Sequence, residues 1–342
     1  MKTTVRPVVV TTDPLHPDTL RELQGMVQLE QVSPADATCF STAMARAQAL
    51  IVRSRLPEDV VDHAPRLRAI LRHGAGVDLI PVDRASAAGV AVCNVPGVNA
   101  PTVAQYVLGQ LVVLRRRLAQ AEHCLREGRW AEGRAVGDLG EDPADGVLGI
   151  VGYGAVGQSV QRLATGFFGM QVLVATSRPA ALPLGVEAAS MADLFQRADA
   201  VVLCCPLNDA TRGMVGSELL GRMRRDAILI NVARGPVVVE QELIDALTGG
   251  RLGGAILDVH DTQPLPISHV LCTLPNVMLT PHIAGVSAGV LRKVGAVVLR
   301  DLRAVLDGRL PGNLVNAEHA GRIAQRWSAL DAQDKQPQEG QT

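Results

Sequence analysis

Residues 147–158 read Val-Leu-Gly-Ile-Val-Gly-Tyr-Gly-Ala-Val-Gly-Gln, and this stretch decides the fold. The apolar run at 147–151 predicts a buried strand, and Gly152, Gly154 and Gly157 complete a G-x-G-x-x-G. Apolar residues at helical spacing follow over 155–168. A glycine turn between a strand and a helix lets backbone N–H groups and the helix dipole meet a pyrophosphate. The motif in this context therefore predicts a dinucleotide-binding site rather than a merely structural turn.

The composition limits the partners that the chain can have. Its 342 residues suffice for two domains, and with 47% hydrophobic but only 2% aromatic residues the core must be aliphatic. Lys and Arg number 33 against 34 Asp and Glu, which argues against nucleic acid or a membrane surface as a partner. No apolar stretch reaches the roughly 18 residues of a membrane span. The six cysteines include no C-x-x-C, which favours reduced thiols and a cytoplasmic setting, and no metal site is expected.

Short apolar runs alternate with helical segments along the chain, which predicts parallel α/β sheets. In the first hundred residues a helix is expected over 57–64. A long helix is expected from Thr102 toward Trp130, followed by a polar loop over 131–146. Strands are then expected near 147–152, 171–176, 200–205, 227–232, 254–258 and 277–280. Six such strands suit a doubly wound dinucleotide fold.

Four polar side chains follow the expected strands of this second half. Because open α/β sheets bind ligands outside the carboxyl ends of their strands, Arg234, Asp258, Gln263 and His282 should converge at one edge. Arg234 offers a planar guanidinium to a carboxylate and a carbonyl oxygen, and His282 can exchange a hydroxyl proton near neutral pH. Asp258 can accept hydrogen bonds from a nicotinamide carboxamide. These groups suit hydride transfer to a 2-oxo acid.

With these motifs the chain resembles the D-isomer-specific 2-hydroxyacid dehydrogenases, the family of phosphoglycerate dehydrogenase and glyoxylate/hydroxypyruvate reductase. The resemblance runs from about Ala49 to Asn316 and rests on segments 72–78, 94–104, 149–157, 198–211, 231–235, 257–264 and 280–285. It implies an α/β fold with two Rossmann-like or flavodoxin-like parallel-sheet domains, the cofactor domain inserted into a discontinuous substrate domain. The substrate domain would comprise residues 1–99 and 288–320, and the dinucleotide-binding Rossmann domain residues 100–287. The polar segment 328–342 is expected to be disordered.

The resemblance also implies roles for individual residues, in an active site at the cleft between the two domains. Arg234, His282 and Gln263 would be catalytic, and Ala75 and Gly76 would hold the substrate carboxylate through their N–H groups, together with Arg234 and His282. Cofactor contacts are expected from Gly152, Gly154, Ala155, Val156, Gly157, Thr176, Ser177, Arg178, Cys205, Pro206, Thr211, Val232, Ala233, Asp258, Thr102, His282 and Ala284. The expected partners are a small 2-oxo or 2-hydroxy acid and a second copy of the chain, because the family is usually dimeric through the helix after Thr102.

One departure from the family pattern is Gln263, where the family usually has a Glu that pairs with the catalytic His. A neutral amide can orient His282 but cannot supply the charge that favours its protonated form. Two alternatives to 2-oxo acid reduction therefore stay open. One is formate oxidation, since formate dehydrogenases also use Gln beside the His. The other is a nucleotide-sensing binding protein of the co-repressor kind.

The second departure concerns the cofactor. An acidic residue about 20 residues past the glycine motif would bind the ribose 2′-hydroxyl of NAD. Here the second strand ends in Thr176-Ser177-Arg178 without an acid. An arginine and two hydroxyls would attract a 2′-phosphate that a carboxylate would repel. The sequence thus favours NADP(H), with NAD(H) as the alternative.

Overall fold

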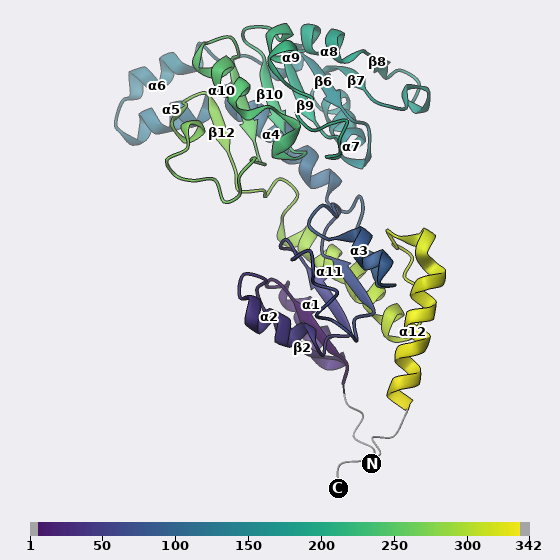
Figure 1. Cartoon of the computed structure of the whole chain (residues 1–342). Helices are drawn as coiled ribbons and strands as arrows, with labels where there is room; N and C mark the ends of the chain where they lie inside the picture. Colours follow the sequence, from purple (N-terminus) through teal and green to yellow (C-terminus); the bar gives the residue numbers. More distant parts are fainter. Residues whose placement is uncertain (1–5, 336–342) are drawn as a thin grey trace. The chain divides into compact units, whose positions relative to one another are not determined.

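The computed structural model describes residues 6–335, which divide into two compact units (Figure 1). One unit is made of residues 6–99 and 287–335, and the other is Ala100–Val286. Each is an α/β unit around one parallel sheet, so the predicted fold class is confirmed.

The first unit is built on a five-stranded parallel sheet of order β2–β1–β3–β4–β5. The strands are β1 (Val8–Thr11), β2 (Gln28–Gln31), β3 (Ala49–Val52), β4 (Ala69–Arg72) and β5 (Ala91–Cys93), and the helices between them are α1 (Pro17–Met26), α2 (Ala37–Met44) and α3 (Val82–Ala87). The helix expected over 57–64 is wrong, because this segment forms only turns with bonds three residues apart, such as Val60 N–H to the Pro57 carbonyl. Pro65 follows directly and disfavours a helical conformation at the residue before it.

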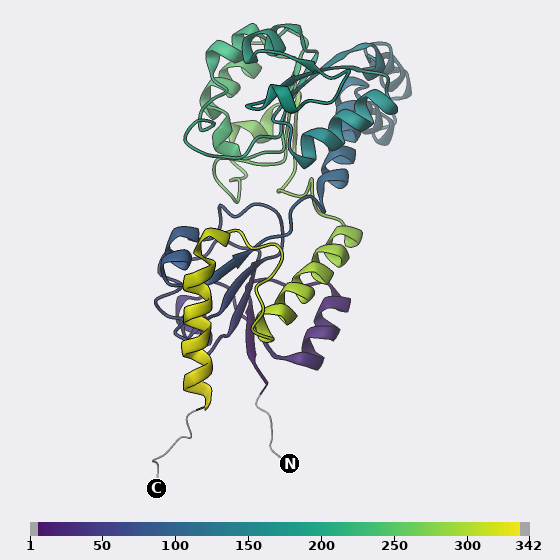
Figure 2. The same ribbon diagram turned by 90° about the vertical axis from the view of Figure 1, so that its right-hand side faces the viewer.

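Two helices from the far end of the chain complete the first unit. In helix α11 (Ala288–Leu306), the Ser287 hydroxyl caps the N-terminus by accepting from Val290 N–H. Figure 2 shows α11 beside α1 on one face of the sheet. Helix α12 (Ala320–Lys335) contributes Ile323 and Trp327 to the buried apolar cluster that α11 and α1 form with this sheet. The disorder expected over 328–342 is therefore wrong for 328–335, because α12 continues to Lys335 and buries Leu330, and 336–342 lie outside the described residues.

The second unit is built on a seven-stranded parallel sheet of order β12–β11–β10–β9–β6–β7–β8. The strands are β6 (Val147–Val151), β7 (Gln171–Ala175), β8 (Glu187–Ala188), β9 (Ala200–Leu203), β10 (Ile228–Asn231), β11 (Gly254–Leu257) and β12 (Val277–Leu279). The six expected strands lie within two residues of their expected bounds, and only the short edge strand β8 was not expected. The strand order reverses between β6 and β9, the point at which doubly wound sheets bind their ligands.

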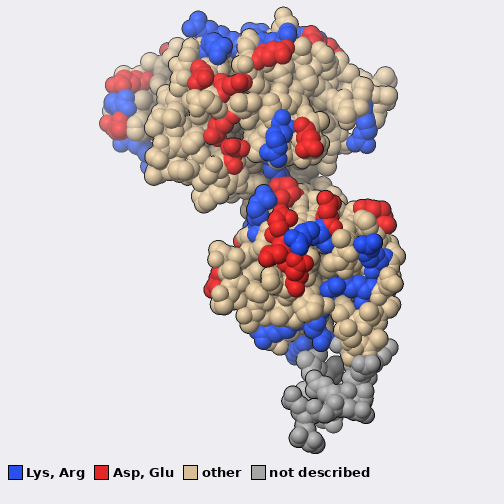
Figure 3. Space-filling view, viewed as in Figure 1, with Lys and Arg blue, Asp and Glu red and all other residues tan. Residues whose placement is uncertain are grey.

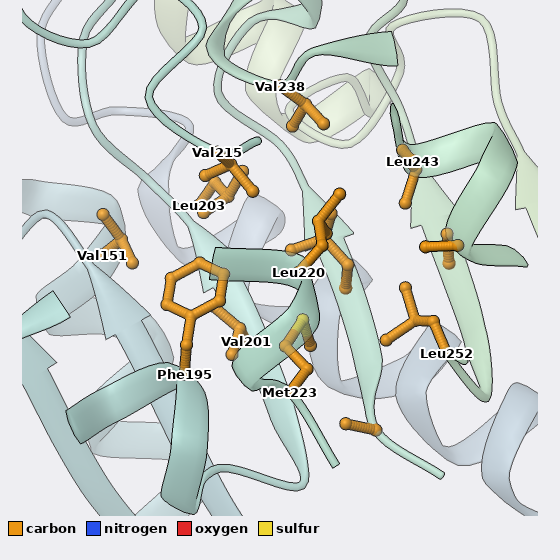
Figure 4. Packing of buried hydrophobic residues seen from close by; sticks show 14 of the residues in the cluster. Val151, Phe195, Val201, Leu203, Val215, Leu220, Met223, Val238, Leu243 and Leu252 are labelled. Atoms are coloured by element: carbon orange, nitrogen blue, oxygen red, sulfur yellow. The ribbon is translucent and has the colours of Figure 1, made fainter. Parts of the chain in front are cut away.

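Helices cover both faces of this second sheet. On one face lie α4 (Ala100–Arg115) and α7 (Ala155–Gly166), and on the other α8 (Met191–Arg197), α9 (Ser217–Arg222) and α10 (Glu240–Thr248). Figure 4 shows the second layer, where Phe195 of α8 and Leu220 of α9 pack with Val201 and Leu203 of β9. Fully buried aliphatic side chains on alternate sides of each strand are typical of a parallel sheet covered on both faces.

The long helix expected from Thr102 to Trp130 is divided in the structure. Helix α4 ends at Arg115, and Arg117 adopts a left-handed conformation with φ 53° before α5 (Leu118–Arg126) begins. A further helix, α6 (Trp130–Gly137), occupies part of the segment expected to be a polar loop and packs against α5. A left-handed residue cannot continue a right-handed helix, so the chain turns there.

The described residues 6–335 contain no helix that is long and apolar enough to cross a bilayer. Figure 3 shows acidic and basic side chains interspersed on the face in view. Within the described part of the chain, His, Cys, Asp and Glu side chains form no group of three or more that could hold a metal ion.

Candidate active site

The strands of the second sheet end in line, which brings their following loops to one edge. In the ladder Val151 pairs with Ala175 and with Leu203, Leu203 with Asn231, Asn231 with Leu257, and Leu257 with Leu279. These are the last residues of six adjacent strands. Neighbouring strands lie about 4.8 Å apart, so the loops form a continuous row. The glycine turn follows β6, and the loops of Arg234 and His282 follow β10 and β12.

The glycine turn has the geometry that a pyrophosphate site needs. Gly152 has φ 92°, a conformation that side chains disfavour, and a Cβ atom there would lie 2.8 Å from Cys205 N. A Cβ on Gly157 would overlap the Gly152 carbonyl oxygen, so helix α7 packs closely on the turn. Gly154 caps α7, and the space beside its Cα is open to 4 Å. This open space lies where N–H groups of the first turn, at Ala155 and Val156, face outward.

The loop after β9 borders this turn and carries three of the expected cofactor residues. Cys205 touches Gly152 through its backbone, and burial raises the pKa of its thiol. The Thr211 hydroxyl donates to the Pro206 carbonyl at 2.7 Å and accepts from Asn208 N–H at 2.9 Å. The Thr211 side chain therefore orders its own loop.

The residues that would meet the ribose follow β7. Thr176 is half-buried, and its hydroxyl accepts from the N–H of Arg178 at 3.3 Å. Ser177 and Arg178 are exposed. The segment 171–181 contains no Asp or Glu, so its formal charge is that of Arg178 alone.

The loop after β10 holds Arg234 through the side chain of Asn231. The Asn231 amide donates to the Arg234 carbonyl at 2.9 Å and accepts from Ala233 N–H at 3.0 Å. Arg234 itself donates to the Ala233 carbonyl at 2.6 Å and adopts extended backbone angles. Both Asn231 and Ala233 are buried, whereas Val232 and Arg234 are partly exposed, so the loop presents the guanidinium from a fixed base.

The loop after β12 presents His282 from a strained backbone. His282 has φ 58°, rare for a residue with a side chain. Its N–H donates to the carbonyls of Asp258 at 2.8 Å and Thr280 at 3.1 Å. The Asp258 carboxylate accepts from the N–H groups of Ile283 at 2.7 Å and Ala284 at 2.8 Å. Asp258 is 2% exposed and anchors the His282 loop, and its contact with a nicotinamide carboxamide stays a prediction.

Tyr106 and Thr280 belong to this arrangement, and sequence reasoning gave neither a role. The Thr280 hydroxyl donates to Asp258 at 2.5 Å and lies 2.7 Å from the hydroxyl of Tyr106 on α4. Burial raises the pKa of Tyr106 to about 12, so its hydroxyl keeps its proton. Tyr106 lies one helical turn after the buried Val103 and one residue before the buried Val107. That spacing placed it on the buried side, but its partner 174 residues away had no local signal.

The remaining expected residues lie in three places. Gln263 is exposed after β11, and its amide nitrogen donates to the His260 carbonyl at 3.2 Å. Thr102 is half-buried in the first turn of α4. Ala75 and Gly76 belong to the first unit, in the loop after β4. Their carbonyls accept from Asn94 at 2.7 Å and Arg72 at 2.9 Å, which leaves the backbone N–H groups as the candidate ligands there.

These features fit a dinucleotide cofactor on the chain's own geometry. The glycine turn supplies a positive φ at Gly152, a close helix at Gly157 and open space at Gly154, all at the strand-order reversal. Anions bind at such helix N-termini. Arg234 and His282 follow strands on the β9 side of the reversal, and Arg178 follows β7 on the other side.

Known proteins resemble this chain in sequence and in fold. The model of the D-isomer specific 2-hydroxyacid dehydrogenase NAD binding domain matches residues 108–284. A glyoxylate reductase of Thermococcus kodakarensis is 36% identical over 306 residues, which cover 87% of this chain and 88% of that protein. Two crystal structures cover most of the chain as well. A protein of Thermus thermophilus has a TM-score of 0.83 at 33% identity, covering 90% of this chain and 99% of its own.

The second crystal structure is an NADPH-dependent glyoxylate/hydroxypyruvate reductase of Sinorhizobium meliloti in complex with NADP and malonate. It has a TM-score of 0.81 at 28% identity and covers 91% of this chain and 97% of its own.

Proposed function

Because the chain belongs to the D-isomer-specific 2-hydroxyacid dehydrogenase family, which consists of oxidoreductases, we propose that it reduces a small 2-oxo acid with NADPH as the preferred hydride donor. The substrate would be of the glyoxylate or hydroxypyruvate type and the product the D-2-hydroxy acid. The observation that carries this proposal is the row of strand ends in the second unit. There the glycine turn, the Arg234 loop and the His282 loop share one edge of one sheet.

A dinucleotide held at the turn of Gly152, Gly154 and Gly157 would supply a hydride for the carbonyl carbon. The Arg234 guanidinium binds the substrate carboxylate and donates a hydrogen bond to the carbonyl oxygen, where negative charge develops. His282 gives its proton to that oxygen, which becomes the hydroxyl of the product. Gln263 orients the imidazole without adding a charge.

The test is a panel of glyoxylate, hydroxypyruvate, pyruvate and larger 2-oxo acids, each with NADPH and with NADH. We expect turnover with at least one of the small acids, and His282→Gln should lower kcat by about 100-fold or more, the usual scale of general acid catalysis. The control is Cys272→Ser, because Cys272 is exposed and has no assigned role in the reaction. Absence of turnover with every acid and both cofactors would reject the proposal.

The preference for NADPH rests on the charge after β7. Arg178 with the Thr176 and Ser177 hydroxyls would bind a 2′-phosphate, and no carboxylate in 171–181 would repel it. Arg178→Gln should lower kcat/KM for NADPH by about tenfold, the scale of one exposed charge-assisted contact, and leave NADH nearly unchanged. Arg222→Gln removes a similar exposed charge on α9 and should change neither value. A preference of the parent protein for NADH would contradict the assignment.

The two alternative functions are separated by the same assays. Formate oxidation would appear as NAD(P)H formation from formate, and Gln263 is the feature that keeps this reaction in view. A sensing protein would bind NADPH or NADH without turning over any acid. Retention of both Arg234 and His282 favours the reductase.

We also propose that the chain forms a homodimer through α5 and α6. Large apolar side chains are exposed there, among them Leu125 at 54% and Trp130 at 65%. Such a patch is typical of a protein interface. Sedimentation of the parent protein should give a dimer, and Trp130→Glu should shift it toward the monomer. A monomeric parent protein at micromolar concentration would reject the proposal.

A further inference from the structure

His260 lies among the loops of the candidate active site but has no part in the reaction proposed for Arg234, His282 and Gln263. It follows Asp258 after β11 and is 7% exposed. Its Nε2 atom lies 3.0 Å from the Thr280 carbonyl oxygen. Because a carbonyl can only accept, Nε2 carries the hydrogen and donates it.

Three loops meet at His260. Its carbonyl accepts from the Gln263 amide at 3.2 Å. Gly235, next to Arg234, packs so closely on this carbonyl that a Cβ at position 235 would overlap it. The Thr280 carbonyl that the imidazole binds is also an acceptor for His282 N–H at 3.1 Å. His260 therefore touches the loops of all three residues assigned to the chemistry.

The second ring nitrogen of His260 indicates that packing alone does not explain an imidazole at this position. Nδ1 is buried and has no hydrogen-bond partner among the residues that the structure describes. A buried polar atom without a partner is unfavourable, and an apolar side chain of similar size would avoid that cost. With an apolar side chain at position 260, the Thr280 carbonyl would still accept a hydrogen bond from His282 N–H and would not be left without a partner. The benefit of the imidazole must therefore lie in the bond that Nε2 makes.

We propose that His260 is a positioning residue for His282, a role that rests on the proposed function. By donating to the Thr280 carbonyl, it holds one of the two peptide groups that accept His282 N–H, beside that of Asp258, and so supports the left-handed backbone at φ 58°. The direction of the His282 imidazole depends on that backbone. Without the donor, the strained residue relaxes and the imidazole loses its alignment toward the substrate.

The test compares His260→Gln with His260→Met in the full chain. The Gln amide nitrogen can occupy the position of Nε2 and donate to Thr280, whereas Met has nearly the same size and cannot donate. We expect His260→Met to lower kcat by about 10- to 100-fold, the scale of a small misplacement of a reacting group. KM for NADPH should stay within about twofold and the thermal midpoint within a few degrees. His260→Gln should recover most of kcat.

A second readout does not depend on turnover. The ring ¹H–¹³C resonances of His282, identified by their loss in His282→Gln, should shift in His260→Met and stay close to the parent position in His260→Gln. Equal effects of the two variants on kcat and on these resonances, or no effect of either, would overturn the positioning role. If the parent protein turns over no 2-oxo acid, the proposed function fails, and the resonances alone decide the inference.

Discussion

The Tyr106 hydroxyl lies 2.7 Å from the Thr280 hydroxyl, which in turn donates to the buried carboxylate of Asp258. This relay connects α4 with the loops after β11 and β12, which are more than 150 residues further along the chain. It predicts that removing the Tyr106 hydroxyl and removing the Thr280 hydroxyl lower the free energy of unfolding by different amounts. Tyr106→Phe removes one neutral hydrogen bond and should lower the free energy of unfolding by about 1 kcal/mol.

Thr280→Val should have a larger effect than Tyr106→Phe, because it removes a hydrogen-bond partner from both the partly buried Tyr106 hydroxyl and one oxygen of the buried Asp258 carboxylate. A loss of about 2–3 kcal/mol is expected from such unsatisfied groups. Urea unfolding of the parent protein and both variants measures the difference. An equal loss of unfolding free energy in the two variants would show that Thr280 does not connect Tyr106 with Asp258.

Two glycines of one turn should respond differently to alanine. Gly152→Ala forces a side chain into a left-handed conformation and onto the Cys205 backbone, so we expect a loss of stability of about 2–4 kcal/mol. Gly154→Ala meets no atom within 4 Å and should change stability by less than about 1 kcal/mol. It should nevertheless weaken NADPH binding by about tenfold, since the methyl group would occupy space that the pyrophosphate needs. Thermal unfolding and fluorescence titration separate the two effects, and intact NADPH binding by Gly154→Ala would contradict this placement of the pyrophosphate.

The pH dependence of reduction should change when Gln263 becomes a carboxylate. An opposite charge near an imidazole favours its protonated form, so Gln263→Glu should move the alkaline decline of kcat upward by about 1 pH unit. Thr262→Glu adds the same charge one residue earlier in the same loop and serves as the control. Unchanged pH–rate profiles in Gln263→Glu would show that this side chain does not act on His282.

The first unit should lose stability in mild acid because of His73. Burial and the guanidinium groups of Arg53 and Arg72 lower the pKa of His73 to about 4, from an ordinary value of 6.5. Between these values the unfolded chain binds a proton that the folded chain does not, so stability falls as the pH falls from 6.5 toward 4. The contribution is about 3 kcal/mol over that range. Denaturant unfolding at pH 7 and pH 4.5 should show a smaller decrease in His73→Gln than in the parent protein, and equal decreases would contradict the assignment.

The sequence predicted the parts of the fold that depend on local pattern. The apolar runs that end at Val151, Ala175 and Asn231 are strands because fully buried parallel strands need continuous aliphatic residues. The G-x-G-x-x-G predicted the glycine turn between β6 and α7, in which Gly152 has a positive φ. The polar edge strand β2 (Gln28–Gln31) had no such pattern and is a strand because β1 pairs with it. The break at Arg117 was missed because the apolar spacing continues on both sides of it.

The candidate site was predictable to the level of which loops meet at the sheet edge. Arg234 and His282 follow strands, and parallel strands place their carboxyl ends together. The partners of Asp258 were not predictable, because its bonds to Thr280, Ile283 and Ala284 depend on how one loop folds back on another. The contacts of Tyr106 and His260 likewise arise from packing between distant segments. Long-range hydrogen bonds of this kind leave no spacing in the sequence.

Helix α12 is made late in synthesis, yet it packs on the first unit. Its Arg326 donates to the carbonyls of Ala64, Pro65, Leu67 and Ala88, and Trp327 donates to that of Arg68. With α11, this helix supplies part of the core that covers the first sheet. On the ribosome, residues 6–99 emerge before the two helices that complete the cover of one face of this sheet. During synthesis the first unit therefore exposes part of that apolar face until α11 and α12 have been made.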